Sequence, residues 1–252
     1  MKKKVSPGFR LVKWILRLVY LKMQVVGAEN LPDEPCIIAG NHTQMNGPIA
    51  CELYFPIERY TWCSAEMLHV KEVPDYAFRD FWPRKPLSVR WLYRIFSYLV
   101  APLAAFVLSN ANTIGVRRDA RIMSTFRETL ERLQEGASIV IFPEEEVEYN
   151  NILYNFQEGF VDVARLYHKK TGREISFVPL YIAPALKTMY IGKPIRYCAA
   201  NDPAGERRRI CDYLMQEITD MARALPRHRV VPYPNLPRKL HPYNIPEEVT
   251  PK

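Results

Sequence analysis

The chain has 252 residues, and its 35 Lys and Arg exceed its 27 Asp and Glu to give a formal net charge of +8. A chain of this length can bury a core as one domain without disulfides or metals. Its five cysteines are scattered, without the close pairs that hold zinc or form a redox disulfide, so we expect reduced thiols in the cytosol and no metal site. Zinc-finger spacing, an RNA-binding aromatic signature and an arginine-rich tail are also missing from the sequence, so we expect no nucleic-acid partner and assign the positive charge to an anionic membrane surface.

Residues 9–23 show helical periodicity with a basic stripe and apolar side chains over the rest of the surface. The stripe consists of Arg10, Lys13 and Arg17. Because these charges interrupt the apolar stretch and no small-residue cleavage site follows, the pattern does not indicate a signal peptide. A terminal helix packed on the core and a helix lying in a membrane interface would share this pattern. Trp14 and the flanking lysines favour lipid, so we predict an amphipathic membrane-surface helix over residues 1–23.

A second apolar segment, residues 95–108, carries no charge, follows an aromatic and basic lead-in, and is expected to be broken at Pro102. It is too short to span a bilayer, which takes about 20 apolar residues. A buried core helix and a shallow membrane insertion both fit this length, and the lead-in favours insertion. We therefore predict that residues 71–112 are a membrane-facing insertion, and that the protein is peripheral or monotopic on the cytoplasmic side of the cell membrane.

The rest of the chain alternates between short apolar runs and helical patterns. The runs predict strands at residues 36–39, 138–142 and 175–182 and a strand pair at 189–197; the patterns predict helices at 119–135, 156–170 and 205–225. This alternation indicates an α/β domain over residues 24–225, with a mixed, largely parallel sheet covered by helices. The many prolines of residues 226–252 exclude regular structure, so we expect a tail that wraps the surface or is disordered.

His42 follows the first predicted strand, at the edge where open α/β sheets gather their ligands. Its side chain is well suited to accept a proton near neutral pH. A structural histidine bonded to a backbone carbonyl is the alternative interpretation.

Glu144, Glu145 and Glu146 follow the strand at 138–142. Three adjacent carboxylates are costly to bury together, so at least one should face solvent or a cation. A solvated acidic loop is the simpler interpretation, but the position after a second strand is expected to bring these residues near His42.

Two further segments are candidates for substrate binding. Arg117 and Arg118 precede a predicted helix start, where guanidinium groups and free N–H groups suit a phosphate, although two exposed arginines beside an Asp119 cap fit equally. Pro179 lies near the start of an apolar strand that we interpret as the wall of a pocket.

In this order the four segments resemble the four sequence blocks of the glycerolipid acyltransferase family, whose best-known members acylate lysophosphatidic acid. The likeness extends over residues 24–197, begins with Val26-Gly27-Ala28-Glu29-Asn30-Leu31-Pro32 and includes Phe142-Pro143-Glu144. The resemblance implies that His42 is the base, that acyl-CoA or acyl carrier protein is the co-substrate, and that no other cofactor takes part.

Two blocks depart from the family pattern. Gly47 stands where the family has the aspartate that orients the histidine, and its neighbour Asn46 can accept a hydrogen bond but offers no negative charge. After Phe142-Pro143-Glu144, the residues Glu145-Glu146-Val147 replace the Gly-Thr-Arg of the family pattern, and the acidic run Glu144–Glu146 is a source of substitute carboxylates. With fewer cations and more carboxylates, we expect a lipid acceptor less anionic than lysophosphatidic acid, with a hydroxyl or amine. A catalytically impaired protein that binds lipid or acyl thioester and a thioester hydrolase are the alternatives, and oligomeric state stays open.

Overall fold

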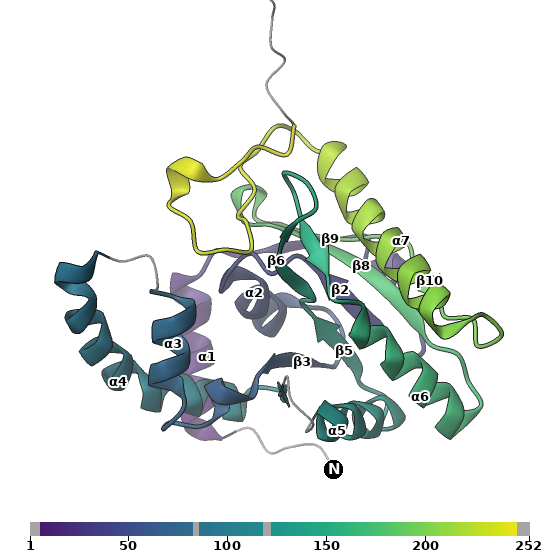
Figure 1. Cartoon of the computed structure of the whole chain (residues 1–252), viewed down its shortest axis with the longest axis horizontal. Coiled ribbons are helices and arrows are strands. Elements are labelled where there is room, and N and C mark those ends of the chain that lie inside the picture. Colours follow the sequence, from purple (N-terminus) through teal and green to yellow (C-terminus); the bar gives the residue numbers. More distant parts are fainter. Residues whose placement is uncertain (1–5, 83–85, 118–121, 246–252) are drawn as a thin grey trace, which may run out of the picture. The chain divides into compact units, whose positions relative to one another are not determined.

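The computed structural model describes residues 6–82, 86–117 and 122–245 (Figure 1). The chain forms two compact units: the first comprises Met1–Tyr20 and Tyr60–Thr129, and the second comprises Leu21–Arg59 and Leu130–Lys252. The first unit therefore joins the predicted N-terminal helix to the predicted insertion.

Helices and strands alternate through most of the chain, as the sequence predicts. The α-helices along the described residues are α1 (Pro7–Val19), α2 (Asn46–Tyr54), α3 (Val73–Asp80), α4 (Leu87–Asn110), α5 (Ile122–Gln134), α6 (Asp162–Thr171) and α7 (Pro203–Arg223). The strands are β1 (Gln24–Val26), β2 (Ile37–Gly40), β3 (Arg59–Ser64), β4 (Thr113–Val116), β5 (Ser138–Ile141), β6 (Glu144–Glu148), β7 (Tyr154–Phe156), β8 (Ser176–Ala183), β9 (Thr188–Ile191) and β10 (Ile195–Arg196).

The sheet of the second unit has the strand order β1-β9-β8-β2-β5. β2 is parallel to both β5 and β8, and every residue of β2 and β5 is buried. Strands buried on both faces read as continuous apolar runs, which is why the sequence revealed them. β9 is antiparallel to β8 and parallel to β1, and α6 and α7 cover one face (Figure 1). The predicted mixed, largely parallel α/β fold is confirmed.

The predicted strand pair at residues 189–197 is arranged differently. β9 and β10 each pair antiparallel with β8, at successive positions along it. Pro179 lies between these two ladders, where its missing N–H breaks no strand pairing.

In the first unit, α4 is one continuous helix of 24 residues that runs through Pro102, so the expectation of a short segment broken at this proline is wrong. By length and composition α4 is able to cross a membrane. Its buried residues are small, namely Ser97, Ala101 and Ala105. The two alanines pack with Met67 and Val73 beside α3. The large apolar side chains of α4 are left on its exposed face, the reverse of an ordinary surface helix.

Residues 226–245 of the second unit, which we name the C-terminal strap, wrap its surface, drawn in yellow in Figure 1. The prolines do exclude strands and α-helices here, apart from an isolated bridge between Arg229 and Tyr243 and a 3-10 turn at Arg238–Leu240. The strap is nevertheless fixed by side-chain hydrogen bonds, since Asn244 donates to the carbonyls of Ala222 and Leu225 at the end of α7.

Candidate active site

The loop after β2 is fixed to the neighbouring strand by Asn41. Its side-chain amide donates to the carbonyl of Ile182 at 3.0 Å, and its side-chain oxygen accepts from the N–H of Ile182 at 2.7 Å. Asn41 is buried and extends the pairing of β2 with β8 by one residue. The next residue, His42, is thereby placed at the carboxyl end of the central strand. Sequence reasoning missed Asn41, for which a buried strand followed at once by an amide was the available signal.

Glu144, the first of the three carboxylates, is buried beside His42 in the second unit. One carboxylate oxygen accepts from the backbone N–H of His42 at 2.5 Å, and the other accepts from the N–H of Tyr154 at 3.0 Å. Burial raises the pKa of Glu144 to about 7, against the lowering effect of these two hydrogen bonds. Glu144 therefore clamps the backbone at His42 and joins it to the β6–β7 hairpin; its carboxylate does not bond the imidazole.

The imidazole of His42 is held by aromatic rings. Phe142 meets it edge-on with the ring centroids 5.3 Å apart, and Tyr233 of the C-terminal strap does the same at 5.8 Å. The Nδ1 atom is buried and has no hydrogen-bond partner among the described residues. Burial lowers the pKa of His42 to about 4, partly offset by the backbone of Gln44, so the ring is neutral at physiological pH. A neutral imidazole is the form that accepts a proton.

The two residues after His42 adopt an unusual backbone. Thr43 and Gln44 have φ values of 47° and 57°, and each such left-handed non-glycine residue costs about 1–2 kcal/mol. Gln44 offsets part of this cost by donating to the carbonyl of Pro234 in the strap at 3.1 Å. Strain of this kind concentrates at functional sites, which supports a functional role for the loop.

The family's aspartate position, Gly47, is closely packed. It lies in the first turn of α2, its N–H donates to the carbonyl of His42, and a Cβ atom here would overlap that carbonyl oxygen and lie 3.0 Å from the ring of Phe142. Asn46 donates its side-chain amide to the carbonyl of Thr43 at 3.0 Å. The glycine is thus a packing requirement of this loop.

The remaining candidates are distributed over both units. Glu145 is half-buried and Glu146 exposed on β6. Arg117 lies in the first unit with its guanidinium 3.8 Å from the carboxylate of Glu72, and Arg118 lies outside the described residues. The structure therefore joins His42, Asn46 and Glu144 in one loop cluster. Pro179 is buried and fills the space next to Gly192, where a Cβ would lie 2.8 Å from its ring.

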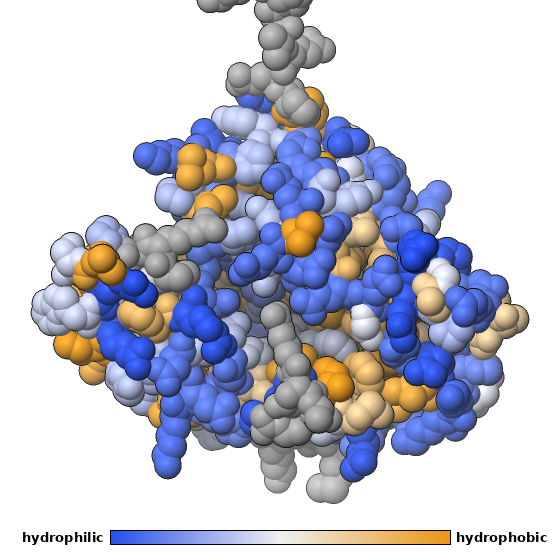
Figure 2. Space-filling view, viewed as in Figure 1, coloured by the Kyte–Doolittle hydropathy of each residue, from blue (hydrophilic) through white to orange (hydrophobic). Residues whose placement is uncertain are grey.

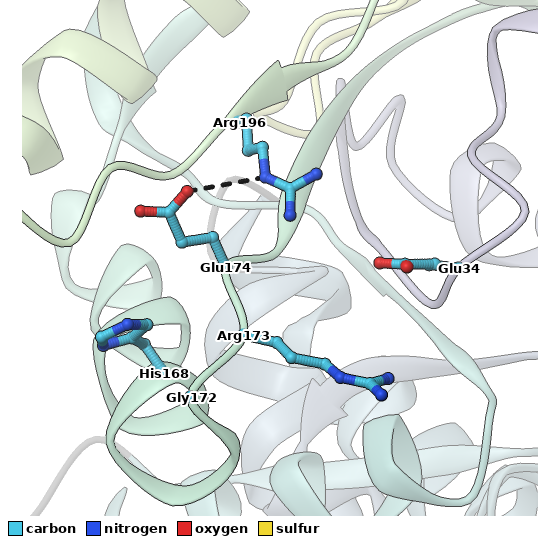
Figure 3. A pocket seen from close by; sticks show the side chains of 6 residues that line it. All are labelled: Glu34, His168, Gly172, Arg173, Glu174 and Arg196. Carbon is cyan, nitrogen blue, oxygen red and sulfur yellow. Dashed lines mark ion pairs between the residues drawn. The ribbon is translucent and has the colours of Figure 1, made fainter.

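An open hollow lies at the opposite edge of the sheet, where β2 and β8 begin (Figure 3). Its lining side chains include the ion pair of Arg196 with Glu174, 3.5 Å apart, together with Arg173, Glu34 and His168. Ligands of open α/β sheets bind at the carboxyl ends of strands. We therefore place the candidate site at His42.

One comparison with known proteins, the match to a family model, agrees with the sequence analysis. The Acyltransferase family model matches residues 90–183. This range contains the second, third and fourth predicted blocks, but it begins after His42 and so does not include the first block. The comparison with curated proteins gives no match. The chain is similar in structure to the 1-acyl-sn-glycerophosphate (LPA) acyltransferase PlsC from Thermotoga maritima, with a TM-score of 0.49 and 16% identity over 84% of this chain and 79% of that one. The family match confirms the predicted resemblance.

Proposed function

From the premise that residues 90–183 carry an acyltransferase-family sequence, we propose that the chain transfers a fatty acyl group from acyl-CoA or acyl carrier protein to a lipid acceptor at a membrane. The observation that carries the proposal is the placement of His42. Its neutral imidazole lies at the carboxyl end of the central strand, fixed by the Asn41 and Glu144 clamps and by two aromatic rings.

The proposed reaction needs one proton acceptor and no covalent enzyme intermediate. The imidazole of His42 removes the proton from the acceptor hydroxyl or amine as its oxygen or nitrogen attacks the thioester carbonyl. The carbon–sulfur bond then breaks, and the leaving thiolate takes the proton from the imidazolium, which returns the histidine to its neutral form. The general-base step contributes a factor of about 10²–10⁴ in rate.

The charges near His42 support an acceptor that is not strongly anionic. Glu145 and Glu146 place carboxylates on β6 beside the clamp, where the family pattern has a glycine and a threonine, and Val147 replaces the arginine of that pattern. Negative charge at this position disfavours a phosphate monoester and favours a neutral or amino lipid. The acceptor we propose is therefore a lipid hydroxyl or amine, distinct from lysophosphatidic acid.

The first unit supports action at a membrane. Trp91 and Leu99 of α4 are 64% and 71% exposed, and Leu18 of α1 is 65% exposed. Figure 2 shows hydrophobic side chains over α4 on the face in view. α4 also carries Arg90 and Arg94, whose guanidinium groups lie over the ring of Phe78 in α3 instead of on the apolar face. We propose that this exposed apolar face contacts lipid on the cytoplasmic side, as a peripheral or monotopic attachment.

The test uses vesicles made from a total lipid extract and an isotope-labelled acyl-CoA or acyl carrier protein. We expect a new labelled lipid with the parent protein and a loss of at least a hundredfold in turnover with His42→Gln. The control is Tyr149→Leu, because Tyr149 is an exposed residue of the same unit. Unchanged turnover of His42→Gln would refute the proposed role of His42, and labelled free fatty acid without an acceptor would indicate a hydrolase.

A second candidate function is binding without catalysis. It is favoured by the unpartnered Nδ1 of His42, because no described carboxylate stabilises the imidazolium that forms during transfer. The same assay distinguishes the two: retained binding of vesicles and acyl thioester with no labelled lipid would establish the binding protein.

A further inference from the structure

The C-terminal strap is a loop closed at its base. The N–H of Val230 donates to the carbonyl of Pro242 at 2.8 Å, and the N–H of His228 donates to the side-chain oxygen of Asn244 at 2.8 Å. The base is also tied to the sheet, because the Nε2 atom of His228 lies 2.7 Å from the hydroxyl of Tyr181 on β8. These contacts fix both ends of the segment 231–241.

The closed part of the strap lies against the loop that holds His42. Tyr233 contacts the imidazole edge-on. The centroid of its ring also lies 6.0 Å from that of Tyr154, whose backbone N–H donates to the carboxylate of Glu144. One residue later, the carbonyl of Pro234 accepts the side-chain amide of Gln44. The strap therefore meets the site at two successive residues, although Pro234 is 190 residues from Gln44 in the sequence.

We propose that the C-terminal strap forms a wall of the acyl-transfer site and that Tyr233 is a positioning residue for His42. The inference rests on the proposed function. The terminal torsion of a histidine is broad and needs a partner to fix it. With Gly47 at the aspartate position and Glu144 bound to backbone N–H groups, the contacts of the imidazole among the described residues are the rings of Phe142 and Tyr233 and the backbone of Gln44.

The same contact shields the imidazole from water. Phe142 and Gly47 bring no charge to it, and the carboxyl of Glu144 faces its backbone. Removing the Tyr233 ring admits solvent to the imidazole and favours its charged form. Tyr233 thus holds the base both oriented and neutral.

The direct test is the ionisation of His42 followed by NMR in protein labelled at the histidine rings, with the signal assigned by His42→Gln. We expect Tyr233→Ala to raise the pKa of His42 by at least one unit and Tyr233→Phe to leave it in place. Tyr149→Ala is the matched control, since it removes an exposed tyrosine of the same unit and is expected to shift nothing. Because titration needs no turnover, this measurement is independent of the proposed function.

Kinetics provide the second arm. Tyr233→Ala is expected to lower kcat about tenfold with little change in the KM of the acyl donor, and Tyr233→Phe is expected to restore it. If Tyr233→Ala does not fold, Gln44→Asn serves instead, because asparagine tolerates the left-handed backbone but is too short to reach the strap. An unmoved pKa of His42 in Tyr233→Ala or Gln44→Asn, or a Tyr233→Phe variant as impaired as Tyr233→Ala, overturns the inference. Turnover that survives His42→Gln overturns the proposed function and leaves the titration result standing.

Discussion

Restoring an aspartate at position 47 should damage the protein, although the family pattern has one there. A Cβ on Gly47 would overlap the carbonyl oxygen of His42, which is backbone, and would lie 3.0 and 3.1 Å from two ring atoms of Phe142. Neither neighbour is the end of a flexible chain, so the loop after β2 has to shift. Overpacking of this kind costs about 1–3 kcal/mol.

Helix propensity and packing have opposite effects on stability at Gly47. Gly47 lies in α2, where replacing glycine by alanine would otherwise stabilise the helix by about 1 kcal/mol. We expect Gly47→Ala to lower the free energy of unfolding by about 1–2 kcal/mol despite this gain. Gly47→Asp is expected to cost more, because it adds a carboxylate at a buried position without an assigned cation. Gly205→Ala, in the first turn of α7, is the matched control: a Cβ there would lie 3.6 Å from the carboxylate of Asp202, an ordinary van der Waals contact, so this variant is expected to be neutral or stabilising.

Urea unfolding followed by circular dichroism measures all three variants, and acyl transfer is assayed on the same samples. A Gly47→Asp protein as stable as the parent would refute the packing argument. If that variant were also more active, Gly47 would be a lost catalytic position instead of a packing requirement.

Three further predictions follow from the charges, thiols and exposed apolar side chains. Burial lowers the pKa of His42 from 6.5 to about 4, so the stability that the neutral imidazole contributes is lost as the pH falls through this range. Burial raises the pKa of Glu144 from 4.5 to about 7, so the stability that the protonated carboxyl contributes is lost as the pH rises through that range. From pH 4 to 6.5, the free energy of unfolding of His42→Gln relative to the parent should therefore decrease by up to about 3 kcal/mol, and a constant difference in urea titrations would contradict this. Cys36 and Cys51 are buried with pKa values raised to about 11 and about 12, so mass spectrometry should find neither alkylated by iodoacetamide at pH 8 until urea unfolds the chain. Leu99→Asp should weaken vesicle sedimentation severalfold without unfolding the protein, and unaltered sedimentation would exclude α4 as the lipid contact.

The sequence predicts strands best where both faces of the strand are buried. β2, β5 and β8 are covered on both faces, so each is a short apolar run that ends in a glycine, a proline or a polar residue, and the pattern locates both the strand and its carboxyl end. That is enough to bring His42 and the residues after Phe142 to the same edge of the sheet.

Helix α4 was harder to predict because its pattern is reversed. Its small residues face α3 and its large apolar residues face outward, so composition revealed an apolar run without its bounds. Pro102 predicts a break, but a proline interrupts a helix only if the freed backbone group and the ring cannot be accommodated. The helix continues for two turns beyond it.

Side-chain partners were the least predictable part of the site. The position of Glu144 beside His42 follows from the strand order, but whether its carboxylate meets the ring or the backbone depends on the conformation of the loop after β2, which the strand pattern does not specify. The strap posed a different difficulty. Its prolines exclude helix and sheet, yet its path depends on hydrogen bonds from Asn244, His228 and Gln44 to partners distant in sequence, which no local pattern reveals.

These contacts together describe a site that fixes the position of its histidine instead of stabilising its charge. Asn41 makes two hydrogen bonds to the backbone of Ile182, and Glu144 accepts one from the N–H of His42 and one from the N–H of Tyr154. The strained residues after His42 are retained at a cost of about 1–2 kcal/mol each. A carboxylate at Nδ1 would raise the basicity of the ring and stabilise the imidazolium, whereas aromatic walls keep it neutral and oriented. Such a base is present in its active form over the whole physiological pH range but gains less from accepting a proton. It is therefore best suited, in the proposed reaction, to an acceptor that needs little activation.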